Sequence, residues 1–170
     1  MKALGIDPGL VITGYGVLEQ TGNEIVLHEA GTIESGDPGL SLSLRLRRLY
    51  DEVMSVIEDH HPEVMALEQL FSHYEHPRTA ILMGHARGVI CLAAGMHNIP
   101  LHHYGATEVK SALTGNGRAS KEQIQRMVRR TFGLVETPRP PDVADAVAIA
   151  LCHLYREGSR SPFEGLRLLK

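Results

Sequence analysis

Cysteine is scarce in this sequence. Only Cys91 and Cys152 occur among the 170 residues, and both lie in apolar stretches with helical spacing. No second thiolate stands at the spacing of a zinc site, so neither a disulfide framework nor a cysteine-based metal centre is expected. Both cysteines are therefore predicted to be reduced, small, buried side chains.

Targeting segments, long apolar spans, internal repeats and low-complexity tracts are also absent to inspection. This absence predicts a cytoplasmic location. Hydrophobic residues make up 43% of the chain and charged residues 22%, which is typical of an ordinary globular protein. The length favours one domain, predicted over residues 1–158, with a flexible C-terminal tail over 159–170.

An excess of positive charge is missing as well, since the formal net charge is -3. The charges are nevertheless segregated. Residues 51–75 contain seven acidic residues and no lysine or arginine, whereas residues 105–130 contain six basic residues and two glutamates. Two interpretations stay open: one basic face on a mildly acidic molecule, or two solvated helix faces of opposite sign.

The order of periodic segments predicts an α/β fold. Strands are expected at 3–7, 13–20, 25–34, 63–68 and 99–105, and helices at 41–60, 78–97, 106–113, 121–132 and 142–157. The first three strands form a meander, and the later strands alternate with helices. This order predicts a mixed sheet with an antiparallel region beside parallel strands, covered by helices.

Acidic residues close two of these strands and begin the last helix. Asp7 ends the first strand and Glu68 ends the fourth, and parallel neighbours would bring both to the carboxyl edge of the sheet. Asp142 and Asp145 are spaced i, i+3, so they share one helix face directly after Pro140-Pro141. The alternatives are a capping role for Asp142 and a solvent-facing strand end for Glu68, which would each explain one acid but not the convergence.

Four clustered carboxylates would repel one another unless they bind cations. Oxygen ligands without a cysteine pair favour Mg²⁺ or Mn²⁺ over zinc. Two such ions about 4 Å apart are typical of phosphodiester hydrolysis. The residues therefore predict a nuclease-type centre in which Asp7, from the rigid middle of the sheet, bridges the two ions.

Five segments occur in the order found in one known family: "GIDPGLVITGYGV", "ALEQLF", "GHARGV", "EVKSALTGNGRASKEQ" and "PDVADAVAIALCH". Together they resemble the RuvC family of Holliday-junction resolvases over residues 2–157. The resemblance implies an RNase H-like (integrase) fold with a five-stranded mixed sheet, three strands antiparallel and two parallel. It also implies a homodimer, Mg²⁺-dependent cutting of four-way DNA junctions, and cooperation with a branch-migration helicase complex of the RuvA and RuvB type. Within the family pattern, the catalytic and metal-binding acids fall on Asp7, Glu68, Asp142 and Asp145.

The resemblance also indicates DNA-binding residues. Phe71 matches an aromatic residue that stacks at the junction centre, although a core or dimer-interface phenylalanine is the alternative. Lys110 and Lys121 match basic positions that approach the DNA backbone, and Arg118 joins them; ordinary solvated side chains are the alternative.

One segment departs from the family pattern. After Phe71 the loop reads "SHYEHPRTA", without the asparagine that relatives usually carry, which leaves the junction-centre contacts and the cut sequence open. His73 and His76 in this loop resemble a metal pair, but an exposed loop is the preferred interpretation. The dimer surface is also open, and a stripe of small residues at Ala80, Gly84 and Gly88 is a candidate for close packing.

Three other functions compete with this one. A nuclease with the same fold could act on an RNA–DNA hybrid. An actin-like nucleotide-binding module is indicated loosely by "LGIDPG", although the chain is short for two lobes. A catalytically silent junction-binding protein would not require all four acids.

Overall fold

The computed structural model describes residues 1–36, 39–69 and 77–158 of the chain. The predicted tail at 159–170 therefore lies outside the described residues. The strands are β1 (Lys2–Asp7), β2 (Ile12–Thr21), β3 (Glu24–Glu34), β4 (Val64–Glu68) and β5 (Leu101–Tyr104). The helices are α1 (Leu42–His60), α2 (Pro77–Met96), α3 (Ala106–Thr114), α4 (Lys121–Thr131) and α5 (Pro141–Glu157).

The strands form one mixed sheet in the order β3-β2-β1-β4-β5. β1 pairs antiparallel with β2, which pairs antiparallel with β3. On its other side, β1 pairs parallel with β4, and β4 pairs parallel with β5. The predicted sheet of three antiparallel and two parallel strands is confirmed, and β1 is its centre.

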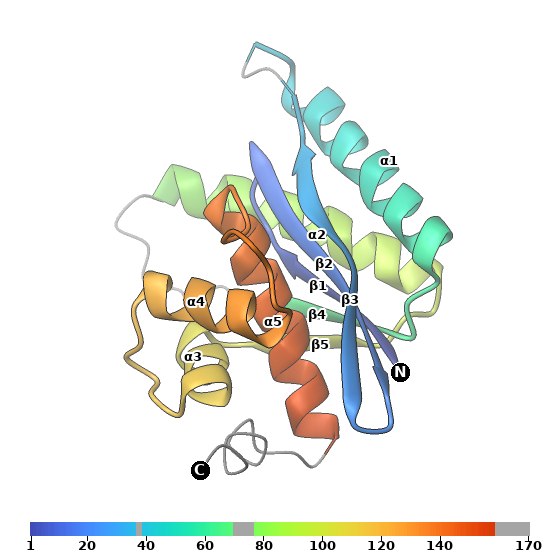
Figure 1. Cartoon of the computed structure of the whole chain (residues 1–170). Helices are drawn as coiled ribbons and strands as arrows, with labels where there is room; N and C mark the ends of the chain where they lie inside the picture. Colours follow the sequence, from blue (N-terminus) through green and yellow to red (C-terminus); the bar gives the residue numbers. More distant parts are fainter. Residues whose placement is uncertain (37–38, 70–76, 159–170) are drawn as a thin grey trace, which may run out of the picture.

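Helices cover both faces of this sheet (Figure 1). In that view α5 crosses in front of the strands with α3 and α4 beside it, whereas α2 passes behind them. Each face has its own hydrophobic cluster: Ala3 and Leu18 pack with α3, α4 and α5, and Leu4 and Ile6 pack with α1 and α2. The alternation along β1 follows from the period of two in a strand.

Local sequence signals set the helix ends. The Ser41 hydroxyl accepts a hydrogen bond from the Leu44 N–H and begins α1, and His61, in the left-handed conformation, ends it just before Pro62. Ser120 and Gln123 form a capping box at the start of α4. Predicted bounds therefore agree with the structure within a residue or two for most elements.

The predicted strand at 99–105 is present as β5, but it begins two residues later and ends one residue earlier than predicted. The Ile99 N–H donates to the Ala94 carbonyl and so completes the turn after α2. Gly105 is the N-cap of α3, where its carbonyl accepts hydrogen bonds from the Glu108 and Val109 N–H groups. Capping at each end leaves only the four residues of β5 to pair with β4.

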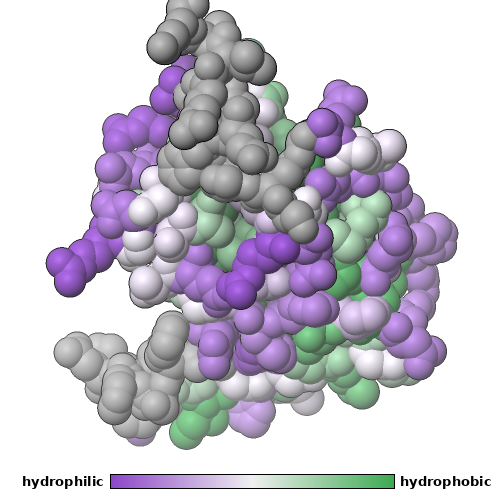
Figure 2. Space-filling view, turned by 90° about the horizontal axis from the view of Figure 1, so that it is seen from below, coloured by the Kyte–Doolittle hydropathy of each residue, from purple (hydrophilic) through white to green (hydrophobic). Residues whose placement is uncertain are grey.

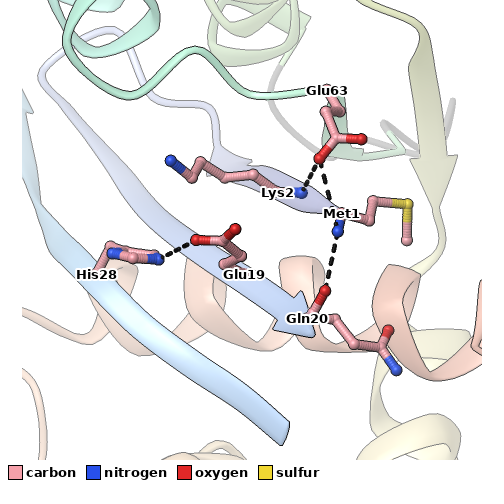
Figure 3. A network of polar contacts seen from close by, with 6 residues as sticks. All are labelled: Met1, Lys2, Glu19, Gln20, His28 and Glu63. Carbon is pink, nitrogen blue, oxygen red and sulfur yellow. Dashed lines mark hydrogen bonds and ion pairs between the residues drawn. The ribbon is translucent and has the colours of Figure 1, made fainter. Parts of the chain in front are cut away.

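A polar network holds the start of β1 in place (Figure 3). The Met1 amino group donates to the Gln20 carbonyl at 2.9 Å and lies 3.5 Å from the Glu63 carboxylate. The Lys2 N–H donates to the same carboxylate at 2.8 Å. These contacts tie β1 to the end of β2 and to the residue before β4, so the strand that carries Asp7 is held at its first residues.

The two cysteines are free, Cys152 buried and Cys91 half-buried, so the prediction of reduced small side chains is confirmed, with Cys91 less enclosed than expected. The predicted close packing of the small-residue stripe on α2 is not found among the described residues, since a Cβ atom built at Gly84 or Gly88 would meet none of them within 4 Å. α2 packs on the sheet through other residues, Ala86, Ile90 and Ala93 among them.

Apolar side chains on the outer face of α2 are exposed, including Ile81 (60%), Leu92 (57%) and Met96 (61%). Among the described residues, α2 is the helix long and apolar enough to cross a membrane by length and composition, over Arg78–Met96, and only 22% of it is buried. One such helix is weak evidence for a membrane span. On the face seen in Figure 2, hydrophilic residues cover most of the described surface and hydrophobic ones form smaller areas between them.

Candidate active site

Asp7 and Glu68 lie next to each other because their strands do. Ile6 and Leu67 are paired in the parallel register of β1 and β4, and each is followed directly by the acid that ends its strand. On the other side Asp7 is opposite Gly14 of β2. Both acids are half-buried. The predicted convergence at the carboxyl edge of the sheet is therefore found.

The first turns of α5 bring the other two acids to the same edge. Pro141 stands at the start of the helix, where a missing N–H is tolerated. A Cβ atom at Gly14 would lie 2.0 Å from the Asp142 carbonyl oxygen, so only glycine allows α5 to lie so close to β2. Asp145, one turn further, is within 3.1 Å of the Lys121 ammonium group.

The electrostatics of Asp7 report this clustering. Burial, followed by the negative charges of Glu68, Asp145 and Asp142, raises the pKa of Asp7 from 3.8 to about 8, and Lys121 opposes the rise. The pKa of Glu68 is also raised, mainly by burial and then by Asp145. All four predicted acids thus interact, and the positive charges of Lys121 and, at Glu68, of Arg87 offset their repulsion only in part.

A cleft of about 220 Å³ opens at these residues. Its lining combines three of the acids with two lysines and an apolar wall from α3, α4 and α5: Asp7, Glu68, Asp145, Lys110, Lys121, Ala106, Val109, Ile124, Ala148 and Ile149. Neither Asp142 nor Arg118 is among the described residues that line this cleft. Asp142 acts on Asp7 through its charge, whereas Arg118 is exposed on the turn between α3 and α4.

The donor set fits a hard divalent cation. Carboxylate oxygens are the ligands that Mg²⁺ and Mn²⁺ prefer, and clustered acids with raised pKa values gain most from a cation among them. The residues that could hold such ions are Asp7, Glu68, Asp142 and Asp145. Phe71, His73, His76 and the first part of the altered loop, residues 72–76, lie outside the described residues. The rest of "SHYEHPRTA", residues 77–80, is not a loop but the first turn of α2.

Sequence reasoning assigned no role to Arg87, which the structure places beside the site. Its guanidinium donates a hydrogen bond to the Glu68 main-chain carbonyl and contacts the Nδ1 atom of His103 at 2.6 Å. The positive charge of Arg87 also opposes the rise in the pKa of Glu68. The sequence signal for Arg87 was its place in "GHARGV", one of the segments of the family pattern. Nothing in the sequence connects that segment to β4.

The basic segment predicted from residues 105–130 folds as α3 and α4. Lys110 and Lys121 face the cleft, and Arg126, Arg129 and Arg130 lie together on α4. The arginines form a basic surface on α4, which fits either of the two interpretations left open by the sequence, one basic face or solvated helix faces.

Comparison with known proteins agrees with this geometry. The family model described as crossover junction endodeoxyribonuclease RuvC matches residues 3–153. RuvC of Rhodopirellula baltica is 54% identical over 152 residues, covering 89% of this chain and 85% of the relative, and RuvC of Caldicellulosiruptor saccharolyticus is 45% identical, covering 94% and 95%. A solved structure of T. thermophilus RuvC in complex with Holliday junction substrate is 36% identical with a TM-score of 0.87, covering 92% of this chain and 94% of that one. The chain has the RNase H-like fold and belongs to the RuvC family of crossover junction endodeoxyribonucleases.

Proposed function

We propose that this protein resolves four-way (Holliday) DNA junctions, making paired symmetric nicks in opposing strands during recombination and repair. The observation that carries the proposal is the convergence of Asp7, Glu68 and Asp145 in one cleft with Asp142 close enough to raise the pKa of Asp7. Family membership supplies the substrate class.

The four acids are proposed to hold two Mg²⁺ ions, with Mn²⁺ as a substitute. When bound, these ions supply activation of the attacking water and stabilisation of the leaving oxygen, which gives 5′-phosphate and 3′-hydroxyl ends. Asp7 is the central ligand because β1 is paired on both sides and Asp7 lies beside Glu68. Arg87 holds the main chain at Glu68 and so orients that ligand.

Lysines in the cleft are proposed to meet the DNA backbone. Lys121 lies 3.1 Å from Asp145 and Lys110 lines the same cleft, so both carry positive charge where the scissile phosphate must approach a negative site. The pairing with Asp145 raises the pKa of Lys121, so this cation persists at neutral pH. Arg118 is proposed to contact DNA farther from the cleft, and Phe71 to stack at the junction centre.

Two nicks in opposing strands call for two active sites, so a homodimer is proposed. The exposed face of α2, with Ile81, Leu92 and Met96 around Gly84 and Gly88, is the surface proposed to pair. Glycines that meet no other described residue permit close helix contact there. A branch-migration helicase complex of the RuvA and RuvB type is the proposed partner, and the cytoplasm the proposed location.

A synthetic immobile four-way junction tests the proposal. Incubation with Mg²⁺ or Mn²⁺ should produce two symmetric nicks that a ligase can seal, mapped on end-labelled strands. The Asp7→Asn protein should bind the junction and fail to cut it. An RNA–DNA hybrid cut in preference to the junction would favour the related RNase activity, and an active Asp7→Asn protein would refute the assigned centre.

A further inference from the structure

A second group of metal-binding side chains lies away from the carboxylate cluster. His102, His153 and Glu157 each offer a ligand atom, and these atoms lie within 4.8 Å of one another. His153 is eight residues after Asp145 on α5, which corresponds to about 12 Å along the helix axis at 1.5 Å per residue. The group is therefore separate from the proposed nuclease centre.

The regular side-chain directions of β5 and α5 bring these side chains together. His102 and Tyr104 alternate with His103 along β5, so both face α5, whereas His103 faces Arg87 of α2. On α5, His153 and Glu157 are spaced i, i+4 and share one helix face. A strand and a helix distant in sequence thus supply ligands from two directions.

His153 is held in an orientation suited to a ligand. Its side chain is 1% exposed, and its Nδ1 atom lies 2.7 Å from the hydroxyl oxygen of buried Tyr104. With the proton on Nδ1, the ring donates to Tyr104 and keeps the Nε2 lone pair for another partner. Metal-binding histidines are commonly oriented in this way by a hydrogen bond from their other nitrogen.

The two imidazoles favour a shared cation over two separate protons. Their ring centroids are 4.7 Å apart, so simultaneous protonation would place like charges against each other. Burial, with the neighbouring His102, lowers the pKa of His153, which keeps the ring neutral as a ligand must be. The hydrogen bond to Tyr104 explains the position of His153, but it does not explain the presence of His102 and Glu157 at the same place.

The nearby positive charge is already balanced. Arg156 lies over the Tyr104 ring, 5.9 Å from its centroid, and forms an ion pair with Glu108. Glu157 is exposed at the last position of α5. Ligand atoms in a tetrahedral zinc site lie about 3.4 Å apart for bonds of about 2.1 Å, so side chains whose ligand atoms lie within 4.8 Å of one another need to move by only about 1 Å to bind one ion.

We propose that His102, His153 and Glu157 bind one transition-metal ion of the zinc class, with water at the remaining position, and that this ion clips β5 to the last turns of α5. Two imidazoles and one carboxylate suit zinc or cobalt better than Mg²⁺, which prefers oxygen ligands alone. The site differs in ligand chemistry from the four-carboxylate cleft, so the two can be loaded and measured separately.

Metal binding to the full chain tests this site. The protein is freed of metal with a chelator, saturated with Mg²⁺ to occupy the carboxylates, and titrated with Zn²⁺ by calorimetry and with Co²⁺ by visible absorption. We expect one tight equivalent per chain and the intense visible band of four-coordinate Co²⁺, and a melting temperature raised by about 5–10 °C at a hundredfold excess of Zn²⁺ over Kd.

His102 is half-buried and Glu157 is exposed, so variants at these two ligands should still fold. His102→Ala and Glu157→Gln should each weaken Zn²⁺ binding at least tenfold and abolish the Co²⁺ band, and Tyr104→Phe should weaken binding about 10–100-fold. His85→Ala and His97→Ala remove exposed histidines of α2 and the turn after it and serve as controls. Zn²⁺ binding that is equal in wild type and His102→Ala, or a Co²⁺ spectrum of six-coordinate character, would overturn the proposal.

Discussion

Replacement of Gly14 by alanine tests whether close packing of α5 against β2 places the acids. The added Cβ would lie 2.0 Å from the Asp142 carbonyl oxygen and 2.4 Å from its carbonyl carbon. Real Cβ contacts essentially never fall below 3.0 Å, and both contacting atoms belong to the backbone. The first turn of α5 must therefore move by about 1 Å or more, and Asp142 and Asp145 move with it.

The size of the effect follows from that displacement. A misplacement of about 1 Å in catalytic geometry lowers rates about 100-fold, equivalent to roughly 2.7 kcal/mol of barrier. Overpacking of this kind destabilises a protein by about 1–3 kcal/mol, which corresponds to a melting temperature lower by about 2–12 °C in a chain of this size. The protein should thus fold and cut slowly.

The assay is single-turnover cleavage of a four-way junction at a temperature well below the melting transition, with junction affinity measured separately in a chelator. Gly31→Ala is the matched control, because the three atoms nearest to its added Cβ, at 2.9–3.1 Å, belong to the Tyr15 side chain on the outer strand pair and not to the backbone. We expect Gly31→Ala to cut at nearly the wild-type rate. A Gly14→Ala protein with wild-type cleavage would show that the position of α5 does not set the catalytic geometry.

Three further outcomes follow from the same structure. Because the pKa of Asp7 is raised from 3.8 to about 8, the metal-free folded state keeps a proton that the unfolded chain loses, so stability should fall as pH rises from about 4 to about 8. Asp7→Asn should therefore melt at a higher temperature than wild type at pH 8 in a chelator, and an equal or lower value by calorimetry would contradict this. Lys121→Met should bind Mn²⁺ at least as tightly as wild type, because the Asp145 carboxylate loses its ion pair with Lys121. The same protein should cut junctions about tenfold or more slowly. Weaker Mn²⁺ binding would exclude the proposed role of Lys121 at the DNA backbone. Leu92→Lys should convert the dimer to a monomer in light scattering, whereas Val135→Lys, at a 91% exposed position, should not, and a dimeric Leu92→Lys protein would exclude the α2 surface.

The strand order and the convergence of acids were predictable from the sequence because each depends on a local rule. Apolar runs that end in Asp7 and Glu68 predict strand ends, and parallel pairing brings such ends to one edge. The i, i+3 spacing of Asp142 and Asp145 after two prolines predicts a shared face at a helix start. No rule beyond periodicity and capping was needed for these elements.

Other features depend on the packing of whole elements and were not predictable. The small-residue pattern of α2 indicated close packing but did not say against what, and a Cβ atom built at Gly84 or Gly88 would meet no other described residue within 4 Å. Arg87 reaches Glu68, 19 residues earlier, only because α2 covers the face behind β4. His102 and His153 meet through the packing of β5 on α5, and no sequence spacing connects them.

The acid cluster also explains why β1 is so firmly held. Mutual repulsion of half-buried carboxylates favours any movement that separates them, and it adds to burial, the largest cause, in raising the pKa of Asp7. The fold opposes it along the strand. The polar network at Met1 and Lys2 ties the first residues, and at Gly5, in the middle of β1, the α5 backbone lies so close that an added Cβ would be 2.3 Å from the Ala146 carbonyl oxygen. Since β1 is paired on both sides, Asp7 cannot move away without breaking strand pairing. Binding of a cation at the proposed site would therefore relieve the repulsion with little rearrangement of the backbone, as expected of a preorganised site at a rigid sheet centre.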